Sequence, residues 1–345
     1  MMLTSSVSPR VVVVFPGQGS QSVGMGGTVF ETAHGIQCLQ AFQQAVNPIE
    51  GIGLSQAMLQ GPQEVLNQTQ LTQPALAAVS VSLYETLKHH VQTYVPDWNP
   101  IAVAGHSLGE YPALYAAGVL SLDTLVTLVS LRGALMQQAP EGAMAAVLGM
   151  TATQVQEALT LYRTTAALEP DTVLLLANEN THQQQVIAAQ KDILAGACEA
   201  LKQAGAKRVV PLPVSGAFHS PLMAPSAQSF SETLVGCQYH APVCPVVMNV
   251  TGRAESTPEV LQTLSTQQMT HSVKWLDTMN TLSALRPDVI LEVGSGNVLT
   301  NMLKKHPALL EACPETQCLA LNTPEAVVAW VTETYSVLPV TAGAC

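Results

Sequence analysis

Aromatic and charged residues are scarce in this chain of 345 residues, at 4% and 11% of the sequence. Apolar residues make up 48%, so a large core is available and must be built mainly from aliphatic side chains. No apolar run approaches the roughly 20 residues that span a bilayer. Met1–Arg10 has no apolar h-region, which argues against a secretory signal. It is Ser-rich and free of acids, but too short to assign as a transit peptide.

Paired cysteine motifs and excess positive charge are also absent. The seven cysteines are odd in number, dispersed and without a C-x-x-C spacing, which predicts reduced thiols of a cytoplasmic protein. Neither a disulfide frame nor a zinc or other metal site is expected from them. The formal net charge of −11 argues against nucleic acid and anionic membranes as partners.

A G-x-S-x-G pattern at Gly105–Gly109 carries the strongest chemical signal. It follows a short apolar strand, Ile101–Ala104, and opens a helix predicted over Glu110–Ala117. A sharp strand-to-helix turn lifts the Ser107 hydroxyl clear of the sheet, and the helix N-terminus places the Leu108 N–H near a developing oxyanion. A turn serine of no catalytic role is the alternative, and this setting makes it the weaker one.

A nucleophilic serine needs a base, and the chain has nine histidines. His106 adjoins the serine, so its side chain leaves the turn in another direction and is interpreted as a packing or substrate-side residue. His219 lies in a loop of small residues just after the apolar strand Val209–Leu212, where parallel-sheet enzymes keep catalytic groups. A purely structural loop histidine remains open from the spacing alone.

A second glycine-rich turn follows the apolar strand Val11–Phe15, with the sequence Pro16–Gln21. Its glycines do not have the G-x-G-x-x-G spacing of a dinucleotide-binding loop. Gln18, between two glycines, is better explained as a backbone N–H donor held close to the serine.

Six segments, taken in order, resemble malonyl-CoA:acyl carrier protein transacylases. The resemblance runs from Val11 to about Glu325, nearly the whole chain, and implies a ping-pong acyl transfer. It implies Ser107 as the nucleophile and His219 as its general base, with the oxyanion bound by the N–H groups of Gln18 and Leu108. The segments are FPGQGSQ, QTQLTQPAL, AGHSLGEY, LVSLRGALMQ, VSGAFHSPLM and EVGSGNVLT.

The same resemblance implies three further roles. Arg132 matches the arginine that pairs with the malonyl carboxylate, Gln268 the residue whose backbone carbonyl orients the histidine, and Asn180 an asparagine beside the thioester. A carbonyl can replace the usual carboxylate because its task is to fix the imidazole tautomer. By itself Arg132 could be a solvated helix arginine, although it is conspicuous in the apolar stretch Leu122–Met136, and a planar bidentate donor suits a free carboxylate.

Three positions depart from the family pattern. Thr181-His182 stands where relatives have Ser-Pro after the Asn-x-Asn, Ala188-Ala189 replaces a glycine, and Gln267 replaces an arginine. The first two put the shape of one substrate-side loop in doubt, and with it the role of Asn180. None of the departures touches the serine, the histidine or Arg132.

The order of elements predicts two domains. Strands and helices alternate up to about Gln138, which is typical of a parallel sheet flanked by helices. Then strands at 143–148, 173–177, 185–188 and 208–212 and helices at 153–162 and 192–204 follow in the order βαββαβ, the ferredoxin-like arrangement. We therefore expect an α/β-hydrolase-like catalytic domain from 1–140 and 209–345, with a small ferredoxin-like domain, 141–208, inserted in it. The active site should lie in the cleft between them.

Three functions are compatible with these residues: a malonyl transferase between coenzyme A and a carrier protein for fatty-acid or polyketide synthesis, an acyl-carrier-protein hydrolase using the same Ser/His pair, and a non-catalytic carrier-docking protein. Arg132 favours the first, because a hydrolase of neutral acyl chains has no use for a buried cation. The expected partners are malonyl-CoA, as a coenzyme A thioester substrate, and an acyl carrier protein, with no permanently bound cofactor and a monomeric enzyme. The carrier is itself acidic, so docking should use local cations, with Lys304, Lys305, Lys207 and Arg208 the candidates.

Overall fold

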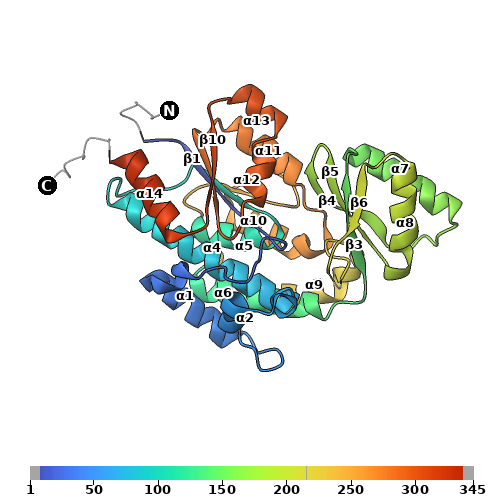
Figure 1. The fold of residues 1–345 in the computed structure, drawn as a ribbon, viewed down its shortest axis with the longest axis horizontal. Helices are drawn as coiled ribbons and strands as arrows, with labels where there is room; N and C mark the ends of the chain where they lie inside the picture. The colour runs from blue at the N-terminus through green and yellow to red at the C-terminus, as the bar shows by residue number, and fades with distance from the viewer. Residues whose placement is uncertain (1–7, 215, 337–345) are drawn as a thin grey trace.

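The computed structural model describes residues 8–214 and 216–336. Met1–Val7, which hold most of the N-terminal segment considered above, and Cys345 lie outside these ranges. Figure 1 shows the chain as two unequal bodies: a large one that contains the first and last thirds of the chain, and a small one from the middle, coloured green to yellow. This is the fold class predicted from the sequence.

The large body is built on a six-stranded sheet in the order β10-β9-β1-β2-β7-β8, in which every neighbouring pair is parallel except the short β7–β8 pair. The fully apolar β1 lies inside the sheet and is buried on both faces, as parallel strands covered by helices must be. The strands are β1 (Val11–Phe15), β2 (Ala102–Gly105), β7 (Val246–Val247), β8 (Ala254–Glu255), β9 (Val289–Val293) and β10 (Gln317–Leu321).

Helices cover both faces of this sheet. Successive residues of β1 show it, because Val11, Val13 and Phe15 belong to one apolar cluster while Val12 and Val14 belong to the other. The first cluster packs under α1 (Ala33–Ala45), α2 (Leu54–Gln60), α3 (Gln63–Leu66), α4 (Thr69–Gln92), α5 (Glu110–Ala116), α6 (Leu122–Gln137), α9 (Ala224–Val235), α10 (Pro258–Gln267) and α14 (Pro324–Tyr335). The second packs under α11 (Trp275–Ala284), α12 (Val298–Leu303) and α13 (Pro307–Ala312).

Short 3₁₀ turns complete the large body at Thr28–Glu31 (η1), Ser107–Gly109 (η2), Pro221–Met223 (η3) and Gln268–Thr270 (η4). Two of them, η2 and η4, carry residues of the site described below. Within residues 8–214 and 216–336, no helix combines the length and the apolar character needed to cross a membrane.

The small body has the predicted βαββαβ order and an antiparallel sheet arranged β4-β5-β3-β6. Its elements are β3 (Ala143–Leu148), α7 (Ala152–Thr165), β4 (Leu174–Thr181), β5 (Gln184–Ala189), α8 (Lys191–Gln203) and β6 (Arg208–Pro211). Both helices pack on one face of the sheet through a separate apolar cluster. The domain boundary expected at 208/209 falls inside β6, which pairs with β3 along its whole length.

The small sheet is joined to the large body through its edge strand β4. Val273, just before α11, donates its N–H to the Ala177 carbonyl at 2.9 Å and accepts the Glu179 N–H at 2.9 Å. This contact fixes the end of β4 beside the sheet that carries Ser107, so that β4 forms one wall of the cleft between the bodies.

Candidate active site

Ser107 sits at the strand-to-helix turn predicted from the G-x-S-x-G pattern. β2 ends at Gly105, the turn η2 begins at Ser107, and α5 continues from Glu110. Ser107 has φ of +51°, a conformation that costs a residue with a side chain on the order of 1–3 kcal/mol. The turn admits only glycine on either side, because a Cβ at Gly105 would overlap the backbone of Gly109 and one at Gly109 would overlap that of Phe15. The hydroxyl is thereby presented to the cleft.

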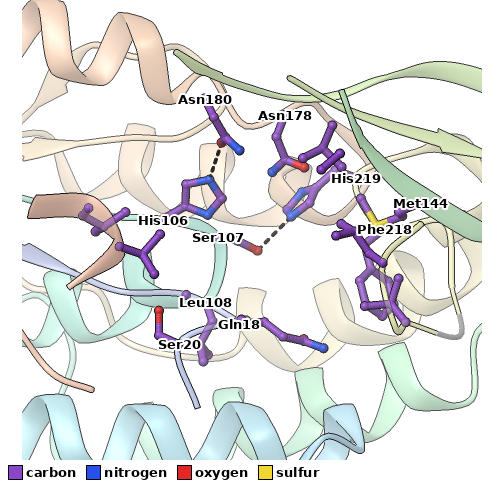
Figure 2. Close-up of a pocket in the computed structure, with 18 of the residues that line it drawn as sticks. Gln18, Ser20, His106, Ser107, Leu108, Met144, Asn178, Asn180, Phe218 and His219 are labelled. Atoms are coloured by element: carbon purple, nitrogen blue, oxygen red, sulfur yellow. Dashed lines mark hydrogen bonds between the residues drawn. The ribbon is translucent and has the colours of Figure 1, made fainter. Parts of the chain in front are cut away.

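The structure brings His219 to this hydroxyl across 112 residues of sequence. Its Nε2 lies 2.8 Å from the Ser107 Oγ (Figure 2), and its Nδ1 lies 2.9 Å from the backbone carbonyl of Gln268. With Nδ1 donating to that carbonyl, Nε2 is left as the acceptor for the serine proton. His219 is therefore placed as the sequence led us to expect, and so is the Gln268 carbonyl.

The imidazole of His219 is kept neutral by its surroundings. Burial, and after it the nearby charge of Arg132, lower the pKa of His219 to about 3 against the opposing hydrogen bond to Gln268. A histidine that stays unprotonated over the whole neutral range is always available to accept a proton from Ser107.

Gln18 and Leu108 lie on two different turns and line the same pocket as Ser107. Figure 2 shows Leu108 and Gln18 on the same side of Ser107, opposite the asparagines of β4. Within residues 8–214 and 216–336, neither the Gln18 N–H nor the Leu108 N–H donates to a protein acceptor. The two turns are pressed together, since a Cβ at Gly17 would overlap the backbone carbonyl of His106. Such a pair of free donors can bind an oxyanion that forms on a group attached to Ser107.

Arg132 is completely buried beside the serine, not solvated. Its Nη1 donates to Gln73 Oε1 at 2.7 Å, and its Nη2 donates to Gln268 Oε1 at 2.9 Å and to the Ser107 Oγ at 3.2 Å. All three acceptors are neutral, and Nε has no hydrogen-bond partner in the part of the chain that the structure describes. The guanidinium also lies over the ring of Tyr111, 5.5 Å from its centroid. The guanidinium is thus held in one orientation by its hydrogen bonds, but it forms no ion pair with a carboxylate among the described residues.

Sequence reasoning missed the polar residues that surround these groups. Gln73, Glu110 and Asn249 are all buried and hydrogen-bonded to the residues above. The sequence did offer one signal for each residue. Glu110 directly follows the G-x-S-x-G pattern, Asn249 ends the apolar run 246–248, and Gln73 lies in the QTQLTQPAL segment. Each signal is ambiguous without the spatial partners.

Asn180 lies on the opposite wall, in β4. Its Oδ1 is 2.8 Å from Nε2 of His106, whose ring packs against Trp275 at 5.5 Å between centroids. Burial lowers the pKa of His106, so the ring donates to Asn180 as a neutral imidazole. Asn178, two residues earlier on the same face of β4, also lines the pocket, and Figure 2 shows it directed toward His219. His106 thus lines the pocket and holds Asn180 in place.

The pocket above Ser107 continues into a second cleft. Gln184, Val298 and Met302 line both, so the two spaces meet between the β4–β5 hairpin and α12. Lys305 lines the second cleft, together with the stacked rings of His182 and His306, whose centroids are 6.3 Å apart. His306 is buried.

The other cations predicted for docking are arranged around the same end of the molecule. Arg208 pairs with Leu148, which in turn pairs with Gln184, so β6 begins at the end of the small sheet that borders the second cleft. Lys207, Arg208 and Lys304 are exposed, and none of them lines the two spaces just described. Among the described residues, no group of three or more His, Cys, Asp or Glu side chains is placed to hold a metal ion.

Comparisons with known proteins show the family to which the chain belongs. The family described as acyl transferase domain matches residues 12–325. The chain is 40% identical to the malonyl CoA-acyl carrier protein transacylase of Synechocystis sp., over 88% of this chain and 93% of that protein. The malonyl CoA-acyl carrier protein transacylase of Coxiella burnetii has the same fold, with a TM-score of 0.84, 29% identity, and 96% and 100% of the two chains covered.

A third relative is solved with its partner. It is a type II PKS acyl carrier protein in complex with its malonyl-transacylase, matched with a TM-score of 0.81 and 32% identity over 95% of this chain and 99% of that one. The fold and the family match define the protein as an acyl transferase. Within that class, the chain belongs to the malonyl-CoA:acyl carrier protein transacylase family.

Proposed function

We propose that this chain transfers a malonyl group from malonyl-CoA to the phosphopantetheine thiol of an acyl carrier protein. The observation that carries the proposal is the environment of Arg132. This buried cation donates only to neutral acceptors among the described residues, and one of these acceptors is the hydroxyl of Ser107. A buried charge without a counter-ion is costly, and a carboxylate on an acyl group attached to Ser107 would supply that counter-ion. The names of the relatives support the same substrate.

In the first half-reaction, His219 accepts the proton of Ser107 as the oxygen attacks the thioester carbonyl. The resulting oxyanion is bound by the N–H groups of Gln18 and Leu108, which have no other acceptor among the described residues. Collapse of the intermediate breaks the carbon–sulfur bond, and the coenzyme A sulfur leaves with the proton that His219 had taken. The product is a malonyl ester on Ser107.

In the second half-reaction, the carrier's thiol replaces coenzyme A and the same steps run in reverse. His219 takes the thiol proton, the sulfur attacks the ester carbonyl, and the serine oxygen leaves with that proton. The Gln268 carbonyl keeps the imidazole in one tautomer throughout, since it accepts from Nδ1. Asn178 and Asn180 supply amides on the thioester side of the pocket. Coenzyme A enters this scheme as a substrate, and no permanently bound cofactor is proposed.

The carrier would dock at the second cleft, where Lys305 is exposed and Arg208 begins the nearby end of β6. A monomer suffices for this scheme, because every group used comes from one chain. The relatives include proteins of polyketide biosynthesis, and we propose fatty-acid or polyketide synthesis as the setting, in the cytoplasm. The six cysteines of the described residues are free thiols, as expected there.

One assay separates transfer from hydrolysis. Release of coenzyme A from malonyl-CoA is measured with and without added holo carrier protein, and the carrier is then weighed by intact-mass measurement. We expect one equivalent of release without the carrier, and continued turnover with a malonyl mass on the carrier when it is present. Continued turnover without the carrier would instead indicate a hydrolase, and no release at all would leave only a docking role.

A further inference from the structure

Glu110 is a buried carboxylate that the mechanism above does not use. It is the first residue of α5, is completely buried, and forms no ion pair within residues 8–214 and 216–336. Its Oε1 accepts from Gln268 Nε2 at 2.9 Å, and its Oε2 accepts from the backbone N–H of Asn249 at 2.6 Å. A carboxylate buried at this depth needs a reason, because removing its hydration is costly.

The Gln268 side chain connects Glu110 to Arg132. Its Nε2 donates to Glu110 and, at 2.9 Å, to the backbone carbonyl of Ser107, while its Oε1 accepts from Arg132 Nη2 at 2.9 Å. An amide has one donor end and one acceptor end. An ionised carboxylate can only accept, so Glu110 requires the NH₂ end, and the oxygen is left to face Arg132.

Asn249 forms a second arm from the same carboxylate to the serine. Its Oδ1 accepts the backbone N–H of Ser107 at 2.7 Å, and its Nδ2 donates to the Gly105 carbonyl at 2.6 Å. Glu110 therefore contacts both residues that hold the backbone around the nucleophile. The Arg132 side of this network ends in the Ser107 hydroxyl, and that is where an acyl group would be attached.

We propose that Glu110 is the positioning residue for carboxylated acyl groups: it fixes the Gln268 amide in the orientation that accepts from Arg132, and it supplies negative charge one amide away without occupying the place of the substrate carboxylate. The arrangement differs from a direct Glu–Arg ion pair, which would neutralise the cation before substrate arrives. This inference rests on the proposed malonyl transfer and adds to it the origin of the acyl-group selectivity.

The electrostatic environment gives this role a pH dependence. Burial raises the pKa of Glu110 to about 7, while the hydrogen bonds from Asn249 and Gln268 and the charge of Arg132 oppose the rise. Protonation removes the negative charge that Glu110 supplies one amide away from Arg132, so the selectivity should be lost as pH falls through about 7. The other titratable groups that face it, Tyr111 and Tyr239, have pKa values raised by burial and stay neutral in this range.

The test is Glu110→Gln, read as the ratio of malonyl to acetyl loading on Ser107 by intact mass after rapid mixing with each coenzyme A thioester. We expect malonyl loading to fall roughly 10- to 100-fold, the scale of one hydrogen bond to a charged group, and acetyl loading to change less than about threefold. Because both substrates are loaded on the same preparation, the ratio does not depend on the fraction that is folded. Equal losses would mean a merely structural role and would overturn the proposal.

Glu292 provides the matched control. It is another fully buried carboxylate, on β9 of the large sheet, but it accepts from the backbone N–H groups of Leu299 and Thr300 at the start of α12 and has no hydrogen bond to Gln268 among the described residues. Glu292→Gln should lower both loadings by the same factor or neither. A change in the malonyl to acetyl ratio as large as that in Glu110→Gln would show that any buried carboxylate of the large body has the effect, and would contradict the proposal.

Two further measurements test the geometry. The exchange variant Glu110→Gln/Gln268→Glu keeps the net charge but places the carboxylate directly against Arg132, so malonyl loading should remain at least as low as in the single variant. Recovery of malonyl selectivity would show that only total charge matters. In the unaltered protein the malonyl to acetyl ratio should fall between pH 8 and pH 6, and in Glu110→Gln it should be flat; a flat ratio in both would overturn the proposal.

These outcomes are separate from the failure of the proposed function. If the unaltered protein loads no malonyl group, the malonyl transfer is wrong and the ratio has no meaning. If it loads malonyl well and Glu110→Gln keeps the same ratio, only the role of Glu110 is wrong.

Discussion

The two ends of the cleft are built in opposite ways. At the acyl end, Gln73, Arg132, Gln268 and Glu110 are buried and connected by direct hydrogen bonds. At the outer end, the second cleft has an exposed cation, Lys305, that forms no ion pair in the described part of the chain. Buried groups are held in one geometry in a low dielectric, whereas exposed charges are screened by solvent and salt. The comparison predicts that the acyl end decides which group is transferred and the outer end decides how fast a carrier arrives.

The first way to break this comparison is to remove the nucleophile. Ser107→Ala deletes the oxygen that lies 2.8 Å from His219, and we expect it to abolish formation of a malonyl-enzyme, because this is the hydroxyl that His219 can deprotonate. Intact-mass measurement after brief exposure to malonyl-CoA checks this. Undiminished acylation in Ser107→Ala would mean that the acyl end is not where the chemistry occurs.

Removing the base should have the next largest effect. His219→Ala leaves Ser107 without an acceptor for its proton and should slow acylation by about 10²–10⁴-fold. In the unaltered protein the pKa of His219 is near 3, so the acetyl loading rate should stay level from pH 8 down to about pH 5. Stopped-time mass measurement gives both quantities. A loss under threefold in His219→Ala would assign the base to another residue.

Arg132 tests whether the acyl end sets selectivity. Arg132→Ala removes the buried cation at the serine, so malonyl loading should fall by the equivalent of about 2–5 kcal/mol, while acetyl loading should hold or rise. Gln73→Ala removes only one neutral acceptor of the same guanidinium and should cause a smaller loss in the same direction. Equal losses with malonyl-CoA and acetyl-CoA would assign Arg132 a structural role.

The same contrast explains what the sequence could predict. The strands were found because Val11–Phe15 and Ile101–Ala104 are continuous apolar runs, and the serine turn because Gly105 and Gly109 are local requirements of the backbone. The domain insertion followed from the order of elements, which the structure confirms. The placing of His219 beside the serine was also expected, with the family resemblance as its main support.

The buried network could not be predicted in this way. Gln268 reaches Glu110 across 158 residues and Arg132 across 136, so no local pattern contains the partners. Asn249 is likewise brought to Ser107 from the turn after β7, 142 residues away. A polar residue that will be buried cannot be told from an exposed one in the sequence. Only the fold shows which polar side chains are buried and which groups they hydrogen-bond.

The smallest expected effect concerns the outer end of the cleft, and adjacent lysines provide both the test and its control. Lys305 lines the second cleft, while Lys304, also exposed, lines neither cleft. Lys305→Glu should raise the KM for the carrier severalfold at low salt, Lys304→Glu should raise it less, and the double reversal should act mainly through Lys305. Serine acylation by malonyl-CoA should remain nearly unchanged in all three.

The salt dependence of the carrier KM shows whether Lys305 acts by long-range electrostatic steering of the carrier. Rim charges act over distances comparable to the Debye length of about 10 Å at 0.1 M salt, so the increase in carrier KM should shrink as salt is raised. Carrier loading followed by mass at several ionic strengths measures it. An unaltered carrier KM at low salt in the double reversal would exclude this pair, and charge reversal at Lys207 and Arg208, at the end of the small sheet that borders the same cleft, would be the next test. An effect that persisted at high salt would mean that Lys305 is buried by the carrier, and the outer end would then resemble the acyl end more than its exposure indicates.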